Sequence, residues 1–129
     1  IDAILQKTPE NKLMITNVLG QTNAQESPGK LLFKINGINY QLDALDEGLE
    51  ELFVIFGDPT NGKETYPTGR FMYVPRPDST GHTVIDFNKA YNPPCAFSVY
   101  ATCPLPPKQN ILPIPIKVGE KKFETASLH

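Results

Sequence analysis

The clearest secondary-structure signal in the chain lies in residues 31–42, which read Leu31-Leu32-Phe33-Lys34-Ile35-Asn36-Gly37-Ile38-Asn39-Tyr40-Gln41-Leu42. Two runs of alternating apolar and polar side chains flank an Asn-Gly pair, and such a pair favours the positive φ angles of a type I′ turn. The register of a two-residue turn pairs Ile35 with Ile38, Phe33 with Tyr40 and Leu31 with Leu42. The pattern therefore predicts an antiparallel hairpin with these six apolar side chains on one face and Lys34, Asn39 and Gln41 on the other.

Other short apolar or alternating runs predict strands at residues 13–18, 52–56, 70–74, 83–87 and 114–118. The turn-rich residues 75–81 predict that the strands at 70–74 and 83–87 form a second hairpin. Residues 45–52 have helical apolar spacing, but Gly48 in their middle limits any helix to a turn or two. Short strands without a long helix predict an all-β fold, an antiparallel sandwich or partly open barrel of about six to eight strands.

The composition predicts one domain over residues 1–129 and argues against two classes of partner. A chain of 129 residues that is 40% hydrophobic can bury a core. Most of its thirteen prolines lie from Pro93 onward, which predicts an irregular, proline-rich C-terminal third. A net charge of −2 and no basic run longer than Lys121-Lys122 argue against nucleic-acid binding. No apolar run reaches the roughly 18 residues of a membrane helix, so we expect a soluble chain with no membrane span.

The two cysteines, Cys95 and Cys103, have seven residues between them, which does not fit the spacing of about two to four residues in zinc sites. His82 and His129 are not placed to complete such a site, so we expect neither a metal nor another cofactor. A disulfide would close a nine-residue loop and stabilise the fold by about 2.5 kcal/mol in an oxidising compartment. The alternative is two buried thiols that pack as small apolar groups in a reducing one.

Polar side chains gather beside two predicted strand ends, where a rigid scaffold can direct them toward a ligand. The candidate ligand-binding residues are Glu64, Tyr66, Arg70, Asp86, Asn88, Tyr91, Asn92 and Glu120, the last if the C-terminus folds back. The alternative is that these groups only satisfy backbone groups of irregular loops. The guanidinium of Arg70 suits a carboxylate of a ligand or of an acid in this chain, and an internal pair with Asp58, Glu64 or Asp86 is favoured.

Several motifs resemble those of a known family: Asp58-x-Thr60-x-Gly62-x-Glu64-Thr65-Tyr66-x-x-Gly69-Arg70, Asp86-Phe87-Asn88-x-Ala90-Tyr91-Asn92-Pro93-Pro94-Cys95, Thr102-Cys103-Pro104-Leu105-Pro106-Pro107 and Gly119-Glu120-Lys121. They are similar to the bacterial and archaeal domain of unknown function 1684. The resemblance covers about residues 31–123 and implies that an upstream part of the family domain is absent, in line with a first residue that is not Met. It also implies a periplasmic or otherwise exported protein, which favours the disulfide. A cytoplasmic setting is the alternative, because archaeal relatives resemble cytosolic proteins.

Three functional hypotheses follow. The first is a β domain that binds a small polar or carboxylate-bearing molecule through the candidate residues. The second is a hydrolase or isomerase in which Asp86 or Glu64 acts as acid or base. The third is a protein-interaction module that presents the proline-rich strip, residues 104–115, to a partner.

Overall fold

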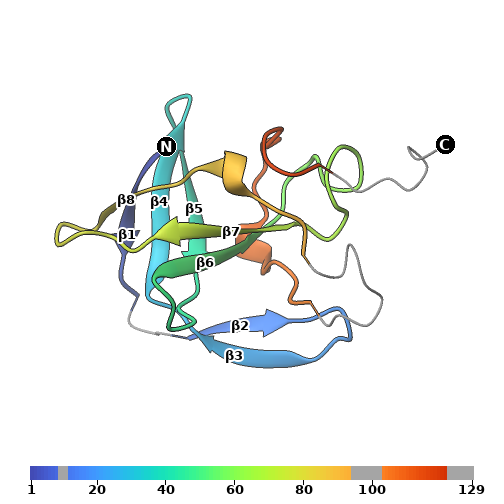
Figure 1. Cartoon of the computed structure of the whole chain (residues 1–129), viewed down its shortest axis with the longest axis horizontal. Helices are drawn as coiled ribbons and strands as arrows, with labels where there is room; N and C mark the ends of the chain where they lie inside the picture. The colour runs from blue at the N-terminus through green and yellow to red at the C-terminus, as the bar shows by residue number, and fades with distance from the viewer. Residues whose placement is uncertain (9–11, 94–102, 122–129) are drawn as a thin grey trace.

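The computed structural model describes residues 1–8, 12–93 and 103–121, which form an all-β structure without a closed barrel (Figure 1). Its strands are β1 (Asp2–Gln6), β2 (Lys12–Thr16), β3 (Thr22–Glu26), β4 (Gly29–Ile35), β5 (Ile38–Ala44), β6 (Glu51–Phe56), β7 (Arg70–Pro75) and β8 (His82–Val84). The described residues also form two 3₁₀ helices, η1 (Phe87–Lys89) and η3 (Lys108–Asn110). None of their helices is long and apolar enough to cross a membrane.

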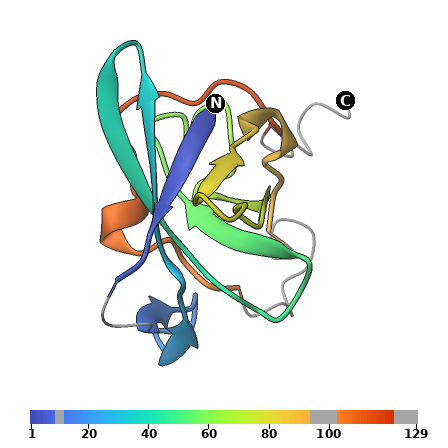
Figure 2. The ribbon, with the colours of Figure 1, turned by 90° about the vertical axis from the view of Figure 1, so that its left-hand side faces the viewer.

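The strands form three antiparallel units: a four-stranded sheet in the order β5-β4-β1-β8, a β2–β3 hairpin and a β6–β7 hairpin. Strands β6 and β7 run crosswise to β4 and β5, and the β2–β3 hairpin lies at one end of the molecule (Figures 1 and 2). The all-β prediction, with sandwich-like packing of sheets, is confirmed.

The predicted β4–β5 hairpin is confirmed in register and in turn chemistry. Leu31 faces Leu42, Phe33 faces Tyr40 and Ile35 faces Ile38. Both turn residues have positive φ, 52° at Asn36 and 79° at Gly37, as a type I′ turn requires. Burial fades toward the tip of the hairpin, from 0% exposure at Leu31 and Leu42 to 58% at Ile38, because the tip extends beyond the core.

The second hairpin predicted from residues 70–87 does not form. Strand β7 pairs with β6, whereas β8 is shorter than predicted and pairs with β1, where Thr83 faces Ala3. Asp78 turns the intervening loop by accepting hydrogen bonds from the backbone N–H groups of Thr80 and His82 at 2.9 and 3.1 Å. No ladder joins β7 to β8, so the pairing with β1, a long-range partner that no local pattern predicts, determines where β8 lies.

Two other predicted elements are wrong. Residues 45–52 form no helix, because Leu45 exchanges backbone hydrogen bonds with Phe53 of β6 and Asp46 accepts the N–H of Gly48 in a turn. Residues 114–118 form no strand. Pro113 and Pro115 have no N–H to donate to a ladder, and the carbonyls of this segment bind a side chain instead.

Strand β6 contributes to both hydrophobic clusters of the core, as the continuous apolar run at 52–56 predicts for a buried strand. Leu52, Val54 and Phe56 pack in the larger cluster with the inner face of the β4–β5 hairpin. Phe53 and Ile55 point the other way, into a smaller cluster that contains Ile15 of β2. One strand thereby joins the four-stranded sheet to the rest of the fold.

The side chain of Asn110 connects β5 to β6 where the two strands separate. Its Oδ1 accepts the backbone N–H of Asp43 at 2.7 Å, and its Nδ2 donates to the carbonyls of Asp43 and Ile55 at 3.0 and 2.9 Å. The residue is 1% exposed, so water cannot replace these bonds.

Replacement of Asn110 with alanine should therefore leave three buried backbone groups without partners and lower the free energy of unfolding by about 2–4 kcal/mol. Gln109→Ala is the matched control, because the neighbouring Gln109 is exposed on the same 3₁₀ helix and its loss should change stability little. Urea unfolding of both variants measures the difference. Equal stabilities would contradict the role assigned to Asn110.

Candidate functional site

Arg70, the one cation among the predicted site residues, lies at the start of β7 and is completely buried. Its Nη2 donates to the carbonyl of Ile116 at 2.8 Å, and its Nη1 donates to that of Val118 at 2.5 Å. Nη2 also lies 3.7 Å from Oδ1 of Asp58, and the ring of Phe56 lies 5.3 Å from the guanidinium carbon. Burial lowers the pKa of Arg70, and the negative charge of Asp58 opposes that shift. The favoured internal ion pair therefore forms, with Asp58 as its acid.

Asp58 holds the same C-terminal segment from the other side. Its Oδ2 accepts the N–H of Ile116 at 2.6 Å, and both of its carboxylate oxygens accept the hydroxyl of Thr60. Gly119 allows the close approach to Arg70, because it has φ of +87° and a Cβ there would lie 2.8 Å from Nη1 of Arg70. The buried pair thus fixes residues 116–119, which have no strand ladder.

Asn92 and Glu120 join this network through their own contacts. The backbone N–H of Asn92 donates to Oε1 of Glu120 at 2.6 Å, and Nδ2 of Asn92 donates to the carbonyl of Lys121 at 3.0 Å. Nη1 of Arg70 lies 3.4 Å from the carbonyl of Glu120. The fold therefore brings Arg70, Asn92 and Glu120 together, with most of their polar groups directed at the protein's own chain.

The other predicted site residues lie in separate surroundings. Asp86 caps η1 by accepting two hydrogen bonds from Asn88, and these bonds lower the pKa of the Asp86 carboxyl. Tyr91 stacks on Tyr73, with ring centres 6.2 Å apart. Glu64 is exposed and Tyr66 is half-buried in the loop between β6 and β7.

The cysteine prediction lies outside the described residues, because Cys95 falls within residues 94–102. The proline-rich strip is described from its start at residue 104, and much of it packs on the fold: Asn110 and Leu112 are buried. Among the residues that the structure describes, no three His, Cys, Asp or Glu side chains gather as the ligands of a metal ion would.

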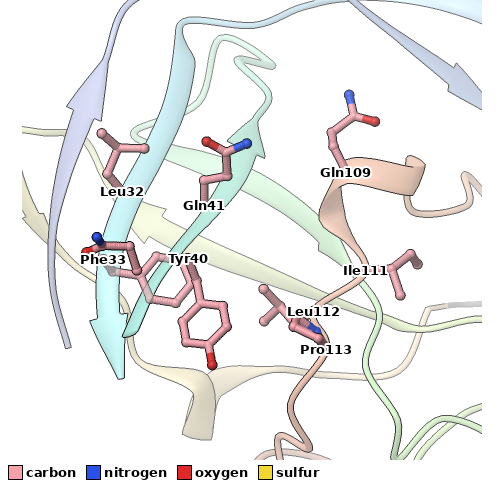
Figure 3. A pocket seen from close by; sticks show the side chains of 9 residues that line it. Leu32, Phe33, Tyr40, Gln41, Gln109, Ile111, Leu112 and Pro113 are labelled. Atoms are coloured by element: carbon pink, nitrogen blue, oxygen red, sulfur yellow. The ribbon is translucent and has the colours of Figure 1, made fainter. Parts of the chain in front are cut away.

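A depression with a volume of about 580 Å³ lies elsewhere, along the outer edge of β5. We call it the β5 groove. Figure 3 shows Tyr40 and Gln41 on the β5 side, facing the segment that carries Gln109, Ile111, Leu112 and Pro113. The lining is completed by Leu32, Phe33 and Asn39.

The β5 groove combines an apolar floor with a neutral polar rim. Phe33 and Leu112 are buried and Tyr40 is half-buried, whereas the amides of Asn39, Gln41 and Gln109 are exposed. No charged side chain lines it. Asn39 and Gln41 lie on the predicted polar face of the hairpin, but the groove itself has no local signal in the sequence, because its other wall comes from residues about 70 positions later in the chain.

We predict that Arg70→Met lowers the free energy of unfolding by about 3–5 kcal/mol, because it leaves the buried charge of Asp58 without its partner. Arg76→Met is the matched control, since Arg76 forms a bidentate pair with Asp46 at the surface and exposed pairs contribute little. Chemical denaturation compares the two variants. Similar losses would show that the Arg70 network is not a principal source of stability.

Tyr91 should make the fold sensitive to alkaline pH. Burial and a hydrogen bond with Tyr73 raise the pKa of Tyr91, so the unfolded chain releases this proton at lower pH than the folded chain does. Stability linked to Tyr91 is then complete below pH 10, its unfolded value, and falls as the pH rises above it. Denaturation between pH 8 and pH 11 should show a smaller fall for Tyr91→Phe than for the unaltered chain, and equal falls would contradict the assignment.

Comparison with known proteins identifies the family. The family model described as "Protein of unknown function (DUF1684)" matches residues 1–121, so the match begins at the first residue rather than near residue 31. The structure resembles the solution NMR structure of an uncharacterized protein of Haloarcula marismortui, with a TM-score of 0.73 and 29% sequence identity, covering 93% of this chain and 69% of that chain. No curated protein sequence matches the chain. The extent of the family match shows that the chain belongs to the DUF1684 family.

Proposed function

We propose that this protein is a ligand-binding β domain whose binding site is the β5 groove. One observation carries the proposal. The depression, with a volume of about 580 Å³, has an apolar floor and several amide groups at its rim. Small-molecule sites have this character, because the apolar surface supplies binding free energy and a few polar groups set the orientation.

The chemistry of the β5 groove favours an uncharged ligand over a carboxylate. Asn39, Gln41 and Gln109 offer neutral donors and acceptors, and none of the lining residues is Lys or Arg. The cation expected to bind a carboxylate, Arg70, instead donates to Ile116 and Val118 and pairs with Asp58. A ligand with an apolar body and amide-like polar groups matches the groove better than an anion.

The enzymatic alternative has less support. A general base works best with a pKa near the working pH. The hydrogen bonds from Asn88 lower the pKa of Asp86, which moves it further from neutral pH. Glu64, the other candidate acid, is exposed on a loop.

The interaction hypothesis partly merges with ligand binding, because Gln109, Ile111 and Pro113 belong to the proline-rich strip and also line the β5 groove. A periplasmic setting with a Cys95–Cys103 disulfide and a cytoplasmic setting with two thiols are both compatible with this proposal, since no cysteine lines the groove.

The proposal is tested by titrating the ¹⁵N-labelled protein with a library of neutral, amide-containing fragments and following its amide resonances. We expect shifts to concentrate at residues 39–41 and 109–112. Ile111→Arg should abolish them, because Ile111 is 51% exposed and an arginine there would place a charge in the groove. Val84→Arg is the matched control: Val84 is 44% exposed on β8, the opposite edge of the same sheet, and its replacement should leave binding unchanged.

Shifts that cluster around Asp86 and Asn88 instead, or that persist in Ile111→Arg, would assign ligand binding to another site. An absence of any localised shift across the library would reject the β5 groove as a small-molecule site.

A further inference from the structure

The outer edge of β5 presents backbone groups to the β5 groove. In a hairpin with a two-residue turn, the residues that flank the turn exchange hydrogen bonds, and bonding then alternates along the strands. Ile38, Tyr40, Leu42 and Ala44 therefore bond to β4, and the intervening residues of β5 direct their N–H and C=O groups outward. The contacts agree with this alternation, because Asp43 and Leu45 both bond outward, to Asn110 and to Phe53.

The outward positions change partner step by step along the edge. Leu45 exchanges two backbone hydrogen bonds with Phe53 of β6, at 2.8 and 2.9 Å. Asp43, two residues earlier, exchanges two hydrogen bonds between its backbone and the side-chain amide of Asn110. Gln41 and Asn39 come next, and within residues 1–8, 12–93 and 103–121 no backbone group pairs with their outward N–H and C=O groups. Both residues line the groove.

Asn110 shows which chemistry this edge accepts. Its Oδ1 and Nδ2 occupy the acceptor and donor positions that a peptide group of a neighbouring strand would occupy beside Asp43. An extended peptide that lies along the β5 groove would continue the same pattern at Gln41 and Asn39. Its alternate side chains would point toward the apolar floor at Tyr40 and Leu112.

From this juxtaposition we infer that the β5 groove binds an uncharged, extended peptide segment, which adds to β5 as a further strand. The inference rests on the proposed function and names the ligand class of the same site. Backbone hydrogen bonds with Asn39 and Gln41 supply affinity, and the apolar floor selects the side chains. The lack of charged residues along the groove favours a segment without charge.

A single strand fits this site better than a second copy of the protein. Pairing of β5 with β5 of another copy would bring the next strand of that copy, β4, up to the wall formed by Gln109, Ile111 and Pro113. The open edge also offers the backbone groups of only two residues, Asn39 and Gln41, and this is a small contact for an interface between two folded sheets.

The test uses pools of hexapeptides, acetylated and amidated at their ends, in neutral, acidic and basic sets, added to the ¹⁵N-labelled protein. We expect a neutral pool to shift the amide resonances of Asn39 and Gln41 and to slow their hydrogen exchange at least tenfold. The amide of Asp43, which Asn110 already covers, should change little. The most active sequence is then resynthesised with N-methyl groups on alternate amides, and one of the two methylation registers should weaken binding at least tenfold.

Two variants separate backbone recognition from side-chain recognition. Gln41→Pro removes an outward N–H without removing a bond to β4, so it should weaken peptide binding at least tenfold. Gln41→Ala keeps that N–H and loses only the side-chain amide, so it should weaken peptide binding less than Gln41→Pro does. If Gln41→Pro does not retain the amide spectrum of the fold, the N-methylated peptides decide the question alone.

The inference is overturned if no pool protects Asn39 and Gln41, or if neither methylation register weakens binding. If neutral fragments still bind to the unaltered protein and Ile111→Arg abolishes their binding, the proposed function stays intact. If neither fragments nor peptides bind, the proposed function and this inference are both rejected. A concentration-dependent dimer that Gln41→Pro dissociates, without peptide binding, would overturn the inference in favour of pairing between copies.

Discussion

The buried pair between Asp58 and Arg70 is the interaction on which the C-terminal part of this protein depends. Residues 113–119 contribute no strand, so they lack the regular ladder that holds other segments. Arg70 binds the carbonyls of Ile116 and Val118, and Asp58 binds the N–H of Ile116. Just before Asp58, Gly57 exchanges backbone hydrogen bonds with Asn110 and Leu112. The end of β6 thus anchors both the C-terminal segment and the far wall of the β5 groove.

Burial of these charges is tolerated because each has several partners. An isolated buried ion costs many kcal/mol of lost hydration, which a single attraction rarely offsets. Here the carboxylate accepts from a threonine hydroxyl and a backbone N–H, while the guanidinium donates to carbonyls and lies beside the ring of Phe56. In these contacts the donors Nη1 and Nη2 of Arg70 face the protein's own backbone. A cation that the sequence offers as a ligand-binding candidate thus makes contacts that hold the fold together.

Local signals in the sequence predicted the local parts of the fold. Asn36-Gly37 determines the register of β4 and β5 because a two-residue turn leaves no freedom to slip, and the run at 52–56 gave β6 because it is apolar on both faces. The pairing of β8 with β1 is a contact between residues about 80 positions apart, and no turn encodes it. Among the site residues, the association of Arg70 with an internal acid followed from the cost of burying charge. The β5 groove did not follow, because it arises where two distant segments meet.

The open edge at Asn39 and Gln41 is a consequence of how the sheets cross. Strand β6 meets this edge only where Phe53 pairs with Leu45, the residue that follows β5. Beyond that point β6 runs crosswise and packs Val54 and Phe56 against the sheet (Figure 1). Asn110 fills the gap that opens at Asp43, and a side-chain amide reaches only one residue of the edge. Proteins usually protect exposed edges with charges, prolines or bulges, yet this edge carries neutral amides beside an apolar floor. The hairpin tip extends past the core, and a fixed segment forms a wall on one side of it, which is the geometry that the proposed addition of one strand requires.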